Sequence, residues 1–205
     1  MSPAYVLEPT YQAIKKRLME GIWPGGFRLD TARLADELGV STSPVRDSLN
    51  HLAGERMVDF EMGAGFHVPR LGERRLRDLF DLNLHLLLMA TQREEELVAS
   101  AAASDDIATR TAIRFLQLAH ASGNGEIVSA IGGLNDRLAA VRHLEPNVLS
   151  APGAELDELD RATPARASAP VIRDILTRYH EVRKIHSGAF ARLRSGDHTD
   201  MSLRL

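Results

Sequence analysis

The sequence of 205 residues contains no cysteine and few aromatic residues, with one tryptophan and three tyrosines. Without cysteine the chain cannot form a disulfide, a thiol nucleophile or a thiolate metal site, which fits a reducing compartment. No apolar run approaches the roughly 18 residues that a membrane span needs. The first ten residues also lack the basic and apolar segments of a signal peptide. We therefore expect a soluble, cytoplasmic protein.

Neither sign of charge dominates the chain, which has 25 Lys+Arg, 28 Asp+Glu and a net charge of −3. Residues 1–78 contain 11 basic and 11 acidic side chains, and residues 79–205 contain 14 and 17. Binding to a nucleic acid would have to depend on a few well-placed cations and helix ends, not on a global basic field. Leu, Ala, Arg and Glu are abundant and β-branched residues are sparse, so the composition favours a mainly α protein.

The first 40 residues contain two helical patterns. From about Leu7, apolar residues recur at steps of three and four, which predicts an amphipathic helix that ends before Pro24. Asp30 or Thr31 can cap a second, short helix, and Gly39 suits the left-handed conformation that ends a helix.

A third helix and a hairpin are predicted next. Ser43 and Pro44 are a helix-starting pair, a cap followed by a proline at the first helical position. Residues 57–61 and 66–69 are short extended segments around a glycine-bearing turn, which predicts a β-hairpin. Three helices followed by a hairpin is the order of a winged helix-turn-helix, which we assign to residues 1–70.

Residues 71–205 are predicted to form an all-helical bundle domain. Helical apolar patterns cover residues 76–88, 105–120, 127–143 and about 170–193. The acidic stretch at 155–160 lies among Pro, Ala and Ser residues and is expected to belong to a loop.

A run of spaced residues points to a known family. The run consists of Leu34-Ala35, Leu38 to Ser41, Pro44-Val45-Arg46, Leu49, Leu52, Gly65 and Val68, and it extends upstream to Leu29 and Pro24-Gly25. With these residues, about 7–69 resemble the DNA-binding domain of the GntR family of bacterial regulators. The chain has Thr42 and Ala32 where that family frequently has arginine, so two cationic contacts are missing.

The resemblance and the physics of groove binding suggest which side chains meet DNA. A helix that enters the major groove presents its first turn to base edges and phosphates. Arg46 is the candidate for a base-edge contact, and Asn50 lies further along the same helix. The remaining candidates, for phosphate or minor-groove contacts, are Ser41, Thr42, Ser43, Gly65, His67, Arg33, Lys15, Lys16 and Arg17. A plain solvated helix face is an equal alternative for Lys15 to Arg17.

Three stretches of the C-terminal part serve as landmarks: DLFDLNLHLLL, AHASGN and HSGAFARLRSGD. With them, this part resembles the helical FCD type of effector domain of the FadR subfamily, and not the β-rich UTRA type. Many FCD domains bind a divalent metal through Asp and His ligands, but Thr111 and Phe115 stand at two of those positions. His186 fits only a third ligand, and Asn83 replaces the arginine that is usual in the first helix. We therefore predict no cofactor, with a metal in this domain as the disfavoured alternative, and an effector that is neutral or more apolar, or none. The remaining histidines could build an unrelated metal site, but histidines at no regular spacing are more often surface or satisfied core residues; they are His85, His120, His143 and His180. The predicted effector pocket consists of Asn83, Phe115, Arg137 and His186.

The sequence thus predicts a homodimeric, DNA-binding transcription regulator whose operator affinity depends on a small-molecule effector. The alternative is a winged-helix protein-interaction or scaffold protein without operator binding. No nucleophile elbow, phosphate-binding loop or paired-carboxylate site stands out, so an enzyme is not expected. The effector, the operator and the choice between repression and activation stay open.

Overall fold

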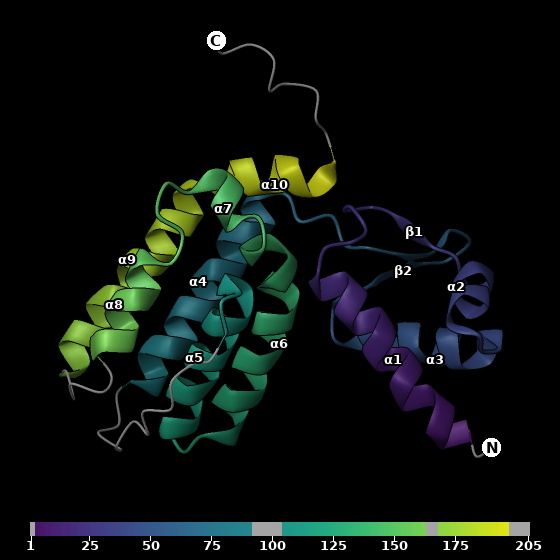
Figure 1. Cartoon of the computed structure of the whole chain (residues 1–205), viewed down its shortest axis with the longest axis horizontal. Coiled ribbons are helices and arrows are strands. Elements are labelled where there is room, and N and C mark those ends of the chain that lie inside the picture. The colour runs from purple at the N-terminus through teal and green to yellow at the C-terminus, as the bar shows by residue number, and fades with distance from the viewer. Residues whose placement is uncertain (1–2, 92–103, 163–167, 197–205) are drawn as a thin grey trace, which may run out of the picture. The chain divides into compact units, whose positions relative to one another are not determined.

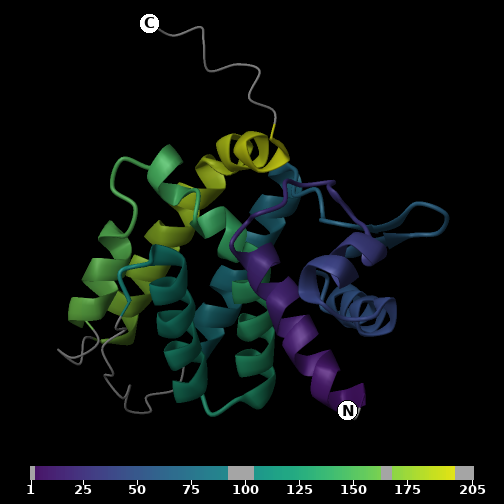
Figure 2. The same ribbon diagram turned by 45° about the vertical axis from the view of Figure 1, so that its right-hand side comes forward.

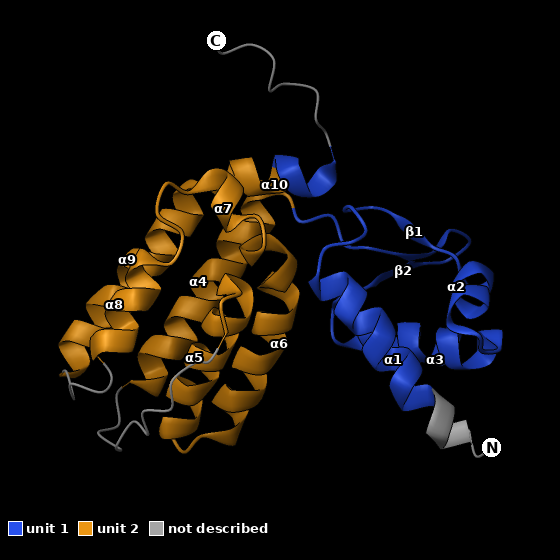
Figure 3. Cartoon of the chain, viewed as in Figure 1, with its two compact units in different colours: residues 1–71, 192–205 blue, residues 72–191 orange. Residues whose placement is uncertain are grey.

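The computed structural model describes residues 3–91, 104–162 and 168–196 (Figure 1). The chain divides into two compact units, one of residues Met1–Leu71 with Arg192–Leu205 and one of residues Gly72–Ala191 (Figure 3). We call these the first and the second unit. In the part of the chain that is described, no helix has the length and apolar character to cross a bilayer.

Three helices form most of the first unit: α1 (Pro3–Met19), α2 (Thr31–Leu38) and α3 (Thr42–Gly54). The predicted cap of α2 is confirmed, because Asp30 Oδ1 accepts hydrogen bonds from the backbone N–H groups of Ala32 and Arg33, both at 2.9 Å. These backbone donors hold the pKa of Asp30 below its usual value, with the N–H of Arg33 contributing most. Gly39 ends α2 with φ +66°, as expected.

The predicted start of α3, with Ser43 as the cap and Pro44 as the first helical residue, is wrong by two residues. The helix begins at Thr42, and its N-cap residue is Ser41, in an extended conformation. Pro44 is therefore the third helical residue. A proline is tolerated there because the N–H groups of the first turn have no intrahelical partner.

A small antiparallel sheet completes the first unit. Its strands are β1 (Arg28–Leu29), β2 (Asp59–Glu61) and β3 (Gly65–His67), in the order β1-β3-β2. Strands β2 and β3 are the predicted hairpin, and Phe60 pairs with Phe66 across it. Strand β1 was not predicted, because two residues are too few to show an alternating pattern.

The core of the first unit lies between the helices and the sheet. Val45, Leu49 and Leu52 of α3 have no exposed surface, and Ile14 of α1 is equally buried. The other buried apolar residues of this core are Tyr11, Leu18, Leu29, Leu34, Ala35, Met57, Val58, Phe66 and Val68. The core therefore holds one face of α3 and leaves the opposite face to solvent.

In the described residues of the second unit the regular elements are all helices, as predicted. Its long helices are α4 (Glu73–Ala90), α5 (Ile107–Ala121), α6 (Gly125–Arg142) and α9 (Ala169–Ile185), which lie side by side as a bundle (Figures 1 and 2). Shorter helices are α7 (Glu145–Val148), α8 (Ala154–Ala162) and α10 (Ser187–Ser195).

Two expectations for the second unit are wrong. The acidic stretch at 155–160 lies in helix α8, because Leu156 and Leu159, three residues apart, are both buried. The predicted helix at 170–193 is two helices, α9 and α10, which meet at His186. Ser187 and Gly188 follow the break, and both residue types have lower helix propensity than Ala or Leu.

The described end of the chain also differs from the predicted domain at 71–205. From Arg192 onward the chain groups with the first unit. There the guanidinium of Arg194 donates to the carbonyl of Trp23, and the N–H of Gly25 donates to the carbonyl of Arg194 at 2.8 Å. The last turn of α10 is thus part of the first unit.

Candidate nucleic-acid interface and interior site

The outward face of α3 is polar. Arg46, Asp47 and Asn50 are exposed, while Val45 and Leu49 are buried on the opposite face. Arg46 makes no ion pair with any residue that the structure describes, so its guanidinium is available to an outside partner. The helical spacing of the sequence also places Asp47 on this polar face, although it is not among the predicted DNA contacts.

The N-terminus of α3 is open to an anion. Ser41, Thr42 and Ser43 are exposed, and the side chain of Ser41 makes no capping hydrogen bond. The backbone N–H groups of the first turn are therefore not occupied by that side chain, and the helix dipole favours a negative group beside them. A DNA phosphate has the charge and acceptor atoms that this helix end suits.

The predicted cations of α1 and α2 differ in their availability. Lys15 is largely buried, and its Nζ lies 2.9 Å from the hydroxyl of Tyr11 and 3.1 Å from Glu55 Oε2. Lys16 and Arg33 are each 75% exposed. Arg17 and Arg33 both bind Glu37, and they hold the pKa of that carboxyl below its usual value, Arg17 contributing most. Lys16 and Arg33 therefore stay candidate phosphate contacts, and Lys15 is the weakest of the set.

The hairpin that forms the wing carries little positive charge. Gly65 adopts φ +92° and is half-buried, as is His67, whose Nδ1 lies 3.2 Å from the carbonyl oxygen of Gly65. Met62, in the turn, is 95% exposed, and the neighbouring Glu61 is also exposed. The surface that the wing presents is thus acidic and apolar.

The sequence of the first unit matches a known family. Residues 8–68 match the family described as bacterial regulatory proteins, gntR family. The similarity to the GntR family thus lies in this segment. The HTH-type transcriptional regulator McbR of Escherichia coli (strain K12) is 35% identical over 77 residues, which are 38% of this chain and 35% of that protein. The gluconate operon transcriptional repressor of Bacillus subtilis (strain 168) is 33% identical over 81 residues, 39% of this chain and 32% of that protein. The matched segments thus span about a third of these relatives.

Solved GntR structures share the fold over both units. The structure of E. coli McbR/YncC covers 89% of this chain and 96% of its own, with a TM-score of 0.63 and 22% identity. A GntR regulator from Rhodococcus sp. RHA1 covers 88% of this chain and 96% of its own, with a TM-score of 0.70 and 17% identity. The GntR segment is therefore followed by a helical domain of known architecture.

The interior of the second unit brings two of the four predicted pocket residues together. Asn83 of α4 and Phe115 of α5 are fully buried, and His180 of α9 lies between them. Asn83 Oδ1 lies 2.9 Å from His180 Nε2, and the rings of Phe115 and His180 stack at 5.6 Å. The sequence prediction did not place His180 in the pocket, because its partner Asn83 is 97 positions away.

The other two predicted pocket residues, Arg137 and His186, are less buried than Asn83 and Phe115. Arg137 is half-buried. Successive helical residues are about 100° apart, so Arg137 lies about 200° around α6 from the buried Asn135, on nearly the opposite face of the helix. His186 is half-buried just after α9, with Nδ1 2.8 Å from the carbonyl oxygen of Val182. The prediction that these two residues line the pocket stays untested.

His180 is neutral in the folded protein. Burial and the nearby charges of Arg142 and Arg183 lower its pKa to about 3. A neutral imidazole has one N–H proton. His180 Nδ1 lies 2.7 Å from the carbonyl oxygen of Leu176. Because a carbonyl oxygen can only accept a hydrogen bond, the proton is on Nδ1. Nε2 is then an acceptor, so the amide of Asn83 has to turn Nδ2 toward it. In the orientation that the structure gives the amide, Asn83 Nδ2 has no hydrogen-bond partner among the described residues.

A second buried cluster is fully paired. Arg183 donates to both carboxylate oxygens of Glu145, at 3.1 and 2.7 Å, and to Glu155 at 3.0 Å. Although burial lowers the pKa of Arg183, the charges of Tyr179 and the two carboxylates outweigh it and raise the pKa overall. Tyr179 also donates to Glu145 at 3.3 Å, and burial raises its own pKa. This cluster holds α7, α8 and α9 together.

Two of the positions that the FCD resemblance assigns to metal ligands hold residues that cannot bind a metal well. Thr111 and Phe115 are fully buried, and the hydroxyl of Thr111 donates to the carbonyl of Ile107 at 2.7 Å. Within residues 3–91, 104–162 and 168–196 no group of three or more potential metal ligands occurs.

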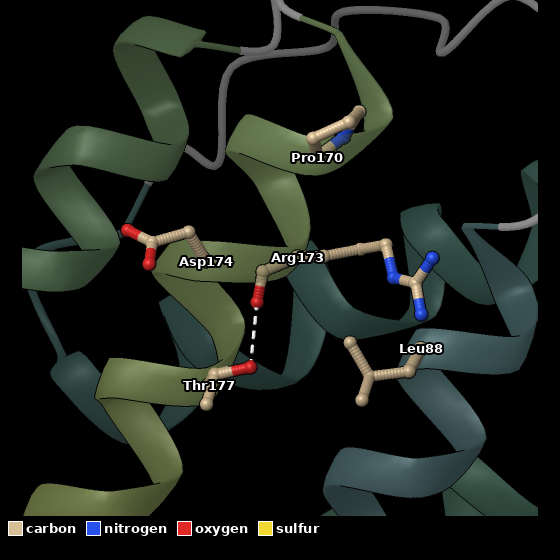
Figure 4. Close-up of a pocket in the computed structure, with 5 residues that line it drawn as sticks. All are labelled: Leu88, Pro170, Arg173, Asp174 and Thr177. Carbon is tan, nitrogen blue, oxygen red and sulfur yellow. Dashed lines mark hydrogen bonds between the residues drawn. The ribbon is translucent and has the colours of Figure 1, made fainter.

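A surface pocket of about 350 Å³ lies elsewhere on the second unit, between α4 and α9 (Figure 4). Its lining includes Leu88, Pro170, Arg173, Asp174 and Thr177. Figure 4 shows the guanidinium of Arg173 beside Leu88 and the carboxylate of Asp174 directed away from it. None of the four predicted pocket residues is in this lining.

Proposed function

We propose that this chain is a DNA-binding transcription regulator of the GntR type. The observation that carries the proposal is the outward face of α3, where exposed Arg46 and Asn50 follow an uncapped helix N-terminus within a GntR segment. A helix with this surface suits the major groove, where arginine forms two hydrogen bonds with guanine. The cytoplasm, where bacterial DNA lies, is the proposed location.

The regulator is proposed to act as a homodimer. Two recognition helices related by a two-fold axis would contact half-sites about one DNA turn apart. Large apolar side chains on the surface of the second unit support a contact between its copies. Leu82 and Met89 lie seven residues apart on α4, and both are about half exposed, as is Val171 of α9. A small-molecule effector in the helical unit would change the relative populations of two dimer arrangements and thereby the operator affinity.

The test is binding of the purified chain to the promoter region beside its own gene, measured by fluorescence anisotropy. The Arg46→Ala variant is expected to bind about tenfold or more weakly, because one bidentate base contact contributes about 1–3 kcal/mol. Arg178→Ala is the matched control, since Arg178 is a partly exposed arginine of the second unit that pairs with Glu158 and Asp174. Equal binding by Arg46→Ala and the control would contradict the proposed recognition helix.

A second candidate function is protein interaction without operator binding. The acidic and apolar wing, with exposed Met62 and Phe60 beside Glu61, favours this alternative. It predicts that the wild-type chain binds promoter DNA no more tightly than unrelated DNA of equal length. A specific affinity that falls in Arg46→Ala and not in Arg178→Ala would exclude it.

A further inference from the structure

Helix α10 belongs to both units. Its residues up to Ala191 group with the second unit, and those from Arg192 onward group with the first (Figure 3). Phe190, in the second-unit part of the helix, has no exposed surface. Arg194, about one helical turn later and in the first-unit part, is 8% exposed. One short helix is therefore anchored by a buried side chain in each unit.

The end of α10 is held on one turn of the first unit, at residues 23–27. The guanidinium of Arg194 donates to the carbonyl oxygen of Trp23. The N–H of Gly25 donates to the carbonyl oxygen of Arg194 at 2.8 Å. The N–H of Phe27 donates to the carbonyl oxygen of Pro24 at 3.1 Å and closes the turn. Both the side chain and the backbone of Arg194 thus bind the 23–27 turn.

The other segment that leads to the second unit lies against the same turn. The N–H of Gly26 donates to the carbonyl oxygen of Val68 at 2.7 Å. A Cβ added to Gly25 would lie 3.3 Å from the carbonyl oxygen of Pro69 and 3.5 Å from that of Arg194. A larger residue at this position would push one of these backbone segments slightly aside. The two segments through which the chain passes between the units therefore meet at the 23–27 turn.

The hold of Arg194 on this turn is weak for a buried cation. Burial lowers the pKa of its guanidinium, and its Nε has no hydrogen-bond partner among the described residues. A backbone carbonyl compensates for only part of the hydration that a buried charge loses. The end of α10 therefore separates from the turn at a small cost in free energy, as elements that move in conformational changes do.

We propose that residues 192–195 of α10 and the 23–27 turn form a clamp that transmits conformational changes of the second unit to the first. Helix α10 has nine residues and is rigid, so a displacement at Phe190 displaces Arg194. The turn leads into β1, which pairs with β3 of the wing through Leu29 and Phe66. The inference goes beyond the proposed function, because it concerns coupling within the chain whether or not the chain binds DNA.

The experiment measures amide hydrogen exchange at Gly25 and Gly26 in the full chain by NMR. The chain has 15 glycines, so selective isotope labelling of glycine gives few signals, and substitution of each of the two residues by alanine assigns them. The N–H of Gly25 binds α10, and that of Gly26 binds Val68 within residues 1–71. Gly26 is therefore the internal reference.

Phe190→Leu changes the anchor of α10 in the second unit. It is expected to speed exchange at Gly25 about tenfold and at Gly26 less than about twofold, because the displaced helix releases only the first N–H. Phe115→Leu makes the same substitution at an equally buried site of α5, and this matched control should leave exchange at Gly25 unchanged. If Phe190→Leu does not fold, Phe190→Met and Phe115→Met, which are closer in volume to the wild type, take their place.

Arg194→Ala tests the other end of the clamp. It should speed exchange at Gly25 by itself, and adding Phe190→Leu should then have no further effect, because both changes act on one contact. Arg192→Ala, at an exposed position of the same helical turn, should leave exchange at Gly25 unchanged.

Four outcomes would overturn the proposal. Unchanged exchange at Gly25 in Phe190→Leu would mean that α10 transmits nothing. Equal acceleration at Gly25 and Gly26 would mean that the first unit loosens as a whole, and equal acceleration by Phe115→Leu would mean that only the stability of the second unit matters. Additive effects of Phe190→Leu and Arg194→Ala would mean that they act through separate contacts. Promoter binding plays no part in these measurements, so its absence would refute the proposed function alone.

Discussion

The two units differ in where they keep their charged groups. In the described residues of the first unit, the buried polar side chains are Thr10, Ser48 and, at the end of α10, Arg194. The second unit buries three arginines together with Glu145 and His180. A core that leaves every described cation except Arg194 outside suits a domain that binds a partner through its surface. A core with charged and polar groups suits a domain that holds a polar ligand.

Within the second unit the same contrast exists between Arg183 and Arg142. Arg183 is matched by Glu145 and Glu155, and its removal would leave buried carboxylates. Arg142 has an amide and an aromatic ring as its partners in the described structure. The paired arginine is therefore expected to contribute more to stability than the unpaired one.

The largest effect is expected for Arg183→Met. This substitution should destabilise the second unit by about 3–5 kcal/mol, because Glu145 is left as an uncompensated buried charge. The measurement is urea unfolding, with circular dichroism reporting mainly the second unit and fluorescence of Trp23, the single tryptophan, reporting the first. Arg178→Met, which breaks a partly exposed pair, should cost less than about 1 kcal/mol. If the two variants lost the same free energy of unfolding, the buried ion pair would contribute no more to stability than the exposed one, contrary to this expectation.

The next largest effect is a loss of stability of the second unit in mild acid. The folded pKa of His180, about 3, lies below its ordinary value of 6.5, so between these values the unfolded chain binds a proton that the folded protein excludes. Stability is thus fully present above pH 6.5 and falls by about 1.4 kcal/mol per pH unit below it. Urea unfolding at pH 8 and about pH 5 should differ by about 2 kcal/mol from this group.

The control for this prediction is the difference between the wild type and His180→Gln over the same range. Other groups that titrate contribute equally to both proteins and cancel. The variant should lose the contribution of His180, whereas His85→Gln, at an exposed position of α4, should keep it. An unchanged pH dependence in His180→Gln would mean that His180 can be protonated within the fold, despite the charges of Arg142, Arg183 and Lys184 around it.

Local features of the fold could be predicted from the sequence because neighbouring residues determine them. The cap at Asp30 and the turn at Gly39 depend on backbone groups within three or four residues, and both were found as expected. The helical period of α3 likewise placed Val45 and Leu49 inside and Arg46 outside. Strand β1 and helix α8 were missed, because their formation depends on packing against distant segments and not on a local pattern.

The interior site could be predicted only in part, for the same reason. Resemblance to a family marked Asn83 and Phe115, but the partners that decide their chemistry come from other helices. His180 meets Asn83 across 97 positions, and Arg142 meets Asn135 at seven positions, a spacing that two residues on one face of a helix often have. The sequence does not show which buried arginine pairs with a carboxylate. Glu145 of α7 and Arg183 are 38 positions apart, and only the fold brings them together.

The smallest effect concerns the first unit and should appear in binding, not in stability. Glu61 is exposed at the end of β2, where a wing that approaches DNA would bring it near phosphates. Glu61→Gln removes this repulsion and should tighten promoter binding about two- to threefold at low salt, with a smaller gain at high salt. Glu126→Gln, an exposed change on α6 of the second unit, should leave the affinity unchanged. Weaker binding by Glu61→Gln would show that the carboxylate makes a favourable contact, such as with a cytosine amino group, and that the wing takes part in sequence readout.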